Sequence, residues 1–135
     1  MQLEGKVRMQ IRVYYEDTDC GNVVYYANYL KYMERSRTEL LRDKGIDLAE
    51  YHTNGYLFAV TEANIRYKAP ARYNDLLDVD SRIIELTPVT MLFSTEIKRA
   101  ADRVLLVQGE VRIACISTAG KAQRIPREVK EKLAF

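Results

Sequence analysis

The sequence has only two cysteines, Cys20 and Cys115, and a single histidine, His52. The cysteines are far apart and form no CxxC pair, which argues against a disulfide framework and against a zinc site. With no partner ligand for His52, a metal centre is not indicated, and we expect this histidine to lie in a loop. Such sparse cysteine usage is typical of a protein that works in the reducing cytoplasm.

Long hydrophobic runs are also missing. No segment approaches the roughly 20 apolar residues that a transmembrane helix needs, and the opening residues MQLEGKVRMQ lack the apolar core of a secretory signal. We therefore expect a cytoplasmic protein with no integral membrane segment. The net charge is only +2, without the clustered basic stripe that nucleic-acid binding favours. A small anionic ligand fits this balance better than a nucleic acid.

The 135 residues are enough for one domain with its own core. Alternating apolar and polar residues over Lys6–Tyr15 predict a half-buried strand. From about Asn28 the spacing becomes helical, and Lys44–Gly45 has the cation and glycine that commonly end a helix. The inward face of this helix is expected to carry Tyr29, Met33, Ser36 and Leu40.

The rest of the chain is rich in strand patterns. The segment Asp47–Asn54 reads as a short, irregular connection that has room for a helical turn. Four strands and a short terminal helix follow, at Tyr56–Lys68, Leu76–Leu86, Met91–Arg99, Arg103–Ser117 and Pro126–Leu133, with a hairpin turn at Ala101–Asp102. This order excludes a doubly wound sheet and favours an antiparallel α+β domain. We expect edge strands such as Arg103–Ser117 to need a partner subunit.

The stretch Tyr14–Leu30, YYEDTDCGNVVYYANYL, joins the first strand to the helix. A turn just before a helix leaves backbone N–H groups unpaired, and the helix dipole adds partial positive charge there. A carboxylate beside such a spot can act on a polarised carbonyl. From the local pattern alone, however, Asp17, Thr18 and Asp19 are more often caps and turn formers than catalytic residues.

The same string resembles the signature of the 4-hydroxybenzoyl-CoA thioesterase family of hotdog-fold proteins, especially its YbgC-like acyl-CoA thioesterase branch. The resemblance continues through KYMERSRTELL in the helix, YKAPARYNDLL at Tyr67–Leu77 and the C-terminal strand. It implies a single hotdog thioesterase domain over residues 1–135, with a curved antiparallel sheet wrapped around one long central helix. The implied reaction is hydrolysis of an acyl-CoA to a free acid and CoA. No cofactor is implied, since coenzyme A is part of the substrate.

The resemblance also assigns roles to residues. Asp19 matches the catalytic acid, either as general base for water or as nucleophile on the thioester carbonyl. The backbone N–H of Tyr26 would polarise the carbonyl oxygen. The turn would be supported by Asp17, Gly21 and Asn22, where glycine and asparagine both tolerate positive φ. Phosphate contacts to CoA would come from Arg66, Lys68, Arg72, Lys121 and Arg124.

Other residues in and near the motif have competing interpretations. Cys20 is a candidate nucleophile, although a small turn residue is the better interpretation. Glu34 and Glu39 offer helix-borne carboxylates but rank below Asp19. Three tyrosines suit either an acyl pocket or core packing, namely Tyr25, Tyr29 and Tyr32.

The family forms homodimers, often paired into homotetramers, with active sites between subunits. The resemblance therefore implies such an assembly, acting on acyl groups carried by CoA or by an acyl-carrier protein. The competing functions are a hotdog dehydratase, disfavoured because the motif contains no histidine, and a non-catalytic module that binds acyl-CoA or acyl-carrier protein.

Overall fold

The computed structural model describes residues 6–134, so the first five residues of the predicted domain and Phe135 lie outside the described range. Its elements are, in order, β1 (Lys6–Arg12), the 3₁₀ turn η1 (Tyr15–Asp17), α1 (Asn28–Asp43), α2 (Leu48–Thr53), β2 (Leu57–Tyr67), β3 (Leu76–Leu86), β4 (Thr90–Arg99), β5 (Leu105–Ile116) and α3 (Arg127–Leu133).

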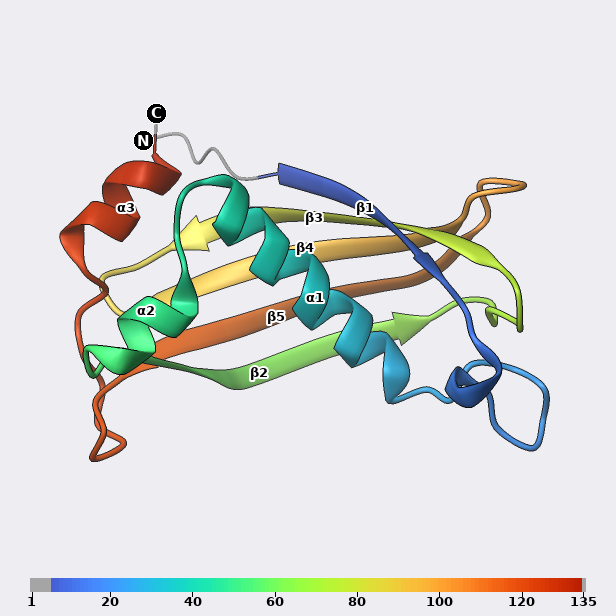
Figure 1. The fold of residues 1–135 in the computed structure, drawn as a ribbon, viewed down its shortest axis with the longest axis horizontal. Helices are drawn as coiled ribbons and strands as arrows, with labels where there is room; N and C mark the ends of the chain where they lie inside the picture. Colours follow the sequence, from blue (N-terminus) through green and yellow to red (C-terminus); the bar gives the residue numbers. More distant parts are fainter. Residues whose placement is uncertain (1–5, 135) are drawn as a thin grey trace.

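The strands form one antiparallel sheet in the order β1-β3-β4-β5-β2. Helix α1 lies across one face of this sheet, with α2 and α3 at one end and η1 with the following turn at the other (Figure 1). This is the predicted hotdog fold, in which the sheet wraps the long helix. No helix within the described residues is long and apolar enough to cross a membrane.

Helix α1 confirms the 3.6-residue pattern. Its buried residues are Tyr29, Tyr32, Met33, Ser36, Leu40 and Leu41. The helix ends where predicted, because Gly45 adopts a φ of +77° and donates its N–H to the Arg42 carbonyl at 2.9 Å, a conformation that glycine reaches without steric cost. The helix packs so closely on β5 that a Cβ on Gly109 would lie 2.8 Å from Met33 Cε.

A chain of buried hydroxyls links the helix to the sheet. Ser36 donates to Ser81 Oγ at 2.6 Å, and Ser81 Oγ lies 2.7 Å from Thr95 Oγ1. Because buried polar groups need partners, these three buried residues satisfy one another beside the apolar core. Their pairing fixes the position of α1 along β3 and β4.

Three predictions about the elements need correction. β1 ends at Arg12 rather than Tyr15, since the chain turns into η1 there. The segment after α1 contains the regular six-residue helix α2, and His52 lies in it rather than in a loop. The prediction that Arg103–Ser117 forms an edge strand was wrong, because β5 pairs with β4 on one side and β2 on the other. The sheet edges are β1 and β2.

Candidate active site

The turn between η1 and α1 is a closed loop. Thr18 and Val24 pair as an isolated antiparallel bridge, and the Asp19 N–H donates to the Val23 carbonyl at 2.9 Å. The Asn22 N–H returns to the Asp19 carbonyl at 3.0 Å. Asn22 is the left-handed residue of the loop, with a φ of +63°, which asparagine tolerates better than other non-glycine residues. These bonds hold Asp19 at the base of the loop.

Gly21 serves this loop differently from the prediction, because it does not adopt positive φ. Its N–H donates to Asp19 Oδ1 at 2.8 Å, and a Cβ at this position would lie 3.1 Å from that oxygen. Glycine therefore allows the backbone to approach the carboxylate closely. Asp19 is exposed, and no group within residues 6–134 donates to its second carboxylate oxygen.

Asp17 ties the turn to the elements on both sides. Its Oδ2 accepts the Tyr14 N–H at 2.8 Å. Its backbone carbonyl accepts the Tyr25 N–H and the Asn28 side-chain amide, each at 2.9 Å. Burial, followed by the charge of Asp17, raises the pKa of the Tyr32 hydroxyl, which lies in the core.

The start of α1 presents backbone donors beside this loop. Ala27 is the N-cap of the helix, and the Asn28 N–H donates to the Tyr25 carbonyl at 2.9 Å. The Tyr26 N–H has no acceptor among the described residues. The Tyr26 hydroxyl raises the pKa of Tyr25, and desolvation and the Asp19 carboxylate act in the same direction. The charge of Asp19 thus acts on the Tyr25 hydroxyl.

A pocket of about 280 Å³ opens at this helix start, lined by Val24, Tyr26, Tyr29, Tyr67, Lys68, Ala69 and Pro70. Tyr67 Oη donates to the Tyr26 carbonyl at 3.3 Å, and the two rings meet edge to face. Of the three candidate acyl-pocket tyrosines, only Tyr29 lines it, because Tyr32 lies in the core and Tyr25 is not among the lining residues. Sequence reasoning named Lys68 as a candidate CoA contact but missed Tyr67, Ala69 and Pro70 as parts of the pocket wall, although the YKAPAR string contained them.

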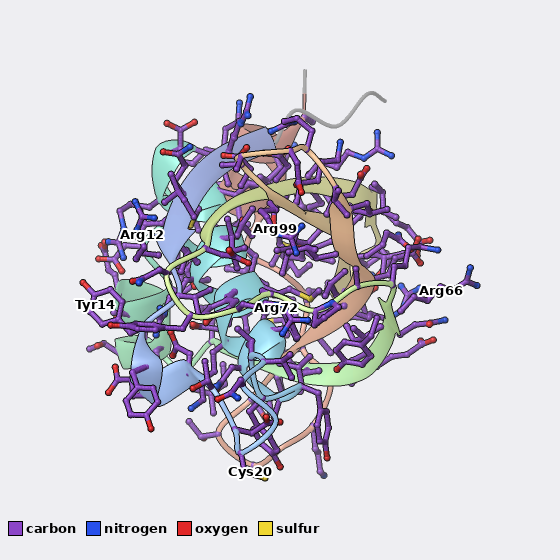
Figure 2. All side chains as sticks on the ribbon, turned by 90° about the vertical axis from the view of Figure 1, so that its right-hand side faces the viewer. Arg12, Tyr14, Cys20, Arg66, Arg72 and Arg99 are labelled. Atoms are coloured by element: carbon purple, nitrogen blue, oxygen red, sulfur yellow. The ribbon has the colours of Figure 1, made fainter. Side chains whose placement is uncertain are left out.

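The five candidate CoA cations fall into two groups. Arg66, Lys68 and Arg72 are exposed at the end of the sheet that carries the turn, and Lys68 lines the pocket. Arg66 points away from the molecule, and Cys20 lies at the tip of the turn (Figure 2). Lys121 and Arg124 follow β5 at the opposite end (Figure 1). One chain therefore does not bring all five together.

The alternative nucleophiles and carboxylates have ordinary surroundings. Cys20 is exposed and Cys115 buried, both as free thiols. Glu34 accepts from Thr38 at 3.3 Å, and Glu39 pairs with Arg42 within α1. Within residues 6–134, no three His, Cys, Asp or Glu side chains are grouped to hold a metal ion.

Comparison with known proteins identifies the family. Residues 13–133 match the thioesterase-like superfamily. The chain is 37% identical over 131 residues to the acyl-CoA thioesterase YbgC of Haemophilus influenzae, covering 95% of this chain and 94% of that protein. It is 34% identical over 123 residues to the acyl-CoA thioester hydrolase YbgC of Escherichia coli O6:H1, covering 90% of this chain and 91% of that protein.

Among solved structures, the chain resembles a variant 4-hydroxybenzoyl CoA thioesterase in complex with 4-hydroxybenzoyl CoA. The TM-score is 0.89 at 17% identity, and the match covers 97% of this chain and 100% of that one. At this identity the likeness is one of fold. By sequence and by fold, the chain belongs to the thioesterase-like superfamily, in its YbgC-like acyl-CoA thioesterase branch.

Proposed function

We propose that this acyl-CoA thioesterase cleaves its substrate with the Asp19 carboxylate, while the Tyr26 N–H binds the thioester carbonyl oxygen. The observation that carries the proposal is the unpaired Tyr26 N–H. Tyr26 lines the pocket and follows the loop that holds Asp19. A backbone donor fixed before the reaction stabilises the oxyanion without reorganising. Losing one such donor typically costs about a hundred- to a thousandfold in kcat.

The Asp19 carboxylate has one oxygen bound to the Gly21 N–H and the other available. In the general-base route, Asp19 takes a proton from water as the water oxygen attacks the carbonyl carbon. The C–S bond then breaks, and the proton passes from Asp19 to the departing CoA thiolate. In the nucleophilic route, Asp19 attacks the carbonyl itself, the C–S bond breaks and CoA leaves as its thiolate. Water then hydrolyses the resulting acyl anhydride, which restores the Asp19 carboxylate and releases the acid, and the thiolate takes up the proton. Both routes consume one water and yield a free acid and CoA.

The size of the pocket supports a proposed position for each end of the substrate. At about 280 Å³ it is smaller than most ligand sites, which span roughly 300–1,000 Å³. It therefore suits the acyl group, with Tyr26, Tyr29 and Tyr67 offering apolar ring faces. The CoA portion would remain on the surface, where Arg66, Lys68 and Arg72 supply cations for its phosphates. The same cations would suit the phosphopantetheine arm of an acyl-carrier protein.

The second group of cations fits a dimer built on the edge strand β2. The Val60 side chain is 54% exposed on this edge, and an unpaired edge invites another strand. Antiparallel pairing of β2 with the partner's β2 across a two-fold axis would place the start of that strand beside Tyr67. Because Leu57 pairs with Ile116, the segment after β5 would come with it, and Lys121 and Arg124 would act in the partner's site.

Two measurements test the proposal. Purified protein should release free thiol, detected with a thiol reagent, from at least one short-chain, long-chain or aromatic acyl-CoA. Folded protein that releases none across the panel, yet binds acyl-CoA, would instead be a binding module. Light scattering should show a dimer or a tetramer at micromolar concentration, and a monomer would rule out a site shared between subunits.

A further inference from the structure

Arg99, the last residue of β4, uses all three guanidinium nitrogens. Its Nε donates to Asp75 Oδ2 at 3.2 Å, its Nη1 to Asp102 Oδ2 at 2.9 Å and its Nη2 to the Pro70 carbonyl at 3.0 Å. Its side chain is only 22% exposed. Figure 2 shows Arg99 near Arg72 at the centre of the end that carries the turn. Arg99 therefore connects the sheet to the segment 68–75.

The segment 68–75 forms one wall of the pocket and also anchors the Asp19 loop. Lys68, Ala69 and Pro70 line the pocket. The Ala71 N–H donates to Tyr29 Oη at 3.0 Å, and the Ala71 carbonyl accepts the Val24 N–H at 2.9 Å. Since Val24 closes the loop by pairing with Thr18, a displacement of this segment would reach both the pocket and the loop.

Besides the Arg99–Asp102 pair, the hairpin that follows β4 has two hydrogen bonds that do not involve the Arg99 side chain. The Arg103 N–H donates to the Arg99 carbonyl at 2.8 Å, and Asp102 Oδ1 accepts the Val104 N–H at 3.1 Å. Both bonds would survive replacement of the Arg99 side chain. The bonds to Pro70 and Asp75 would not. They add to the backbone bonds that also hold the pocket wall, in which the Lys68 and Ala69 N–H groups donate to the Leu106 carbonyl at 2.8 and 3.1 Å.

We propose that Arg99 is a positioning residue for the thioesterase site. It holds the segment 68–75 at the distance that shapes the acyl pocket and seats the Asp19 loop. This role rests on the proposed function. Arginine suits it because its planar fork reaches a carbonyl and two carboxylates at once, whereas a lysine ammonium is a single point charge.

The test compares Arg99→Gln with Arg112→Gln. Arg112 is a matched control, because it also makes two ion pairs, to Glu85 and Glu62, and its side chain is similarly buried, at 27% exposed. Unlike Arg99, it makes no hydrogen bond or ion pair to the described segment 68–75, and it does not line the pocket. We expect Arg99→Gln to raise KM about tenfold, the equivalent of one charge-assisted hydrogen bond, while kcat stays within a few-fold. Arg99→Lys should recover part of the loss, and Arg112→Gln, in the same oligomeric state, should keep the parent's KM.

Amide hydrogen exchange gives a readout that does not need turnover. In Arg99→Gln the Ala71 and Val24 amides should exchange faster, while amides in the middle of β4 and β5 stay protected. A parent enzyme without activity would overturn the proposed function, and exchange would still test the role of Arg99. A parent-like KM or unchanged exchange at Ala71 and Val24 in Arg99→Gln would overturn that role. If Arg99→Gln does not fold, the same two measurements on Arg99→Lys test the role of Arg99. We expect its KM and its exchange at Ala71 and Val24 to lie between those of the parent and those predicted for Arg99→Gln.

Discussion

Replacing Asp19 by asparagine separates catalysis from turn formation. In the structure Asp19 Oδ1 accepts the Gly21 N–H at 2.8 Å, and the oxygen of an asparagine amide can accept the same bond. Asparagine and aspartate are close equals as caps and turn formers. The loop should therefore survive, and the melting temperature of Asp19→Asn should stay close to that of the parent.

The amide can neither take a proton from water nor attack a carbonyl. Loss of a general base costs on the order of a hundred- to ten-thousandfold. We therefore expect kcat of Asp19→Asn to fall at least about a hundredfold, the low end of that range, with KM largely kept. The assay is thiol release from the best acyl-CoA of the panel, alongside thermal unfolding of the same sample.

Asp17→Asn is the control in the same turn. Its amide oxygen can still accept the Tyr14 N–H, but the charge beside the buried Tyr32 hydroxyl is lost. We expect the stability and the activity of Asp17→Asn to fall together, with a smaller loss of activity than in Asp19→Asn. A folded Asp19→Asn protein whose turnover lies within a few-fold of the parent would refute the assignment, and Glu34 would be the next residue to replace.

Two further predictions concern the thiols and the acid limit of stability. Cys20→Ser should keep turnover within a few-fold of the parent, and strong inactivation would instead support Cys20 as the nucleophile. Mass spectrometry of the folded protein after maleimide treatment should show one adduct, on Cys20, because Cys20 is exposed and Cys115 is buried. The hydrogen bond from Gln10, together with Arg8 and Arg103, lowers the pKa of Asp78 below 3.8, and its side chain is 2% exposed. Its stabilising effect is therefore complete above about pH 4 and is lost as the pH falls through the folded-state pKa. When the pH is lowered from about 5 to 3, the urea midpoint of Asp78→Asn should consequently fall less than that of the parent. An equal fall of the two midpoints would contradict this.

Local physical chemistry determined much of this protein from its sequence. The 3.6-residue spacing and Gly45 marked α1, and β3 was predicted with its observed bounds. Asn22 takes the positive φ that its residue type suggested. These features depend on residues close together in the chain, so their patterns can be read directly. The string around Asp19 also indicated the family, because a long motif is specific even without coordinates.

Only the tertiary structure decided how distant segments meet. β2 pairs with β5 rather than with its sequence neighbour β3, which makes β2 an edge, and no alternation pattern encodes strand order. The pocket joins the helix start to the Tyr67–Pro70 segment, and Arg99 reaches that segment from β4. Such contacts depend on how the sheet curves around α1. In the sequence, Arg99 cannot be told from any other surface cation at a strand end, because its carbonyl and carboxylate partners on the segment 68–75 come close to it only in the folded chain.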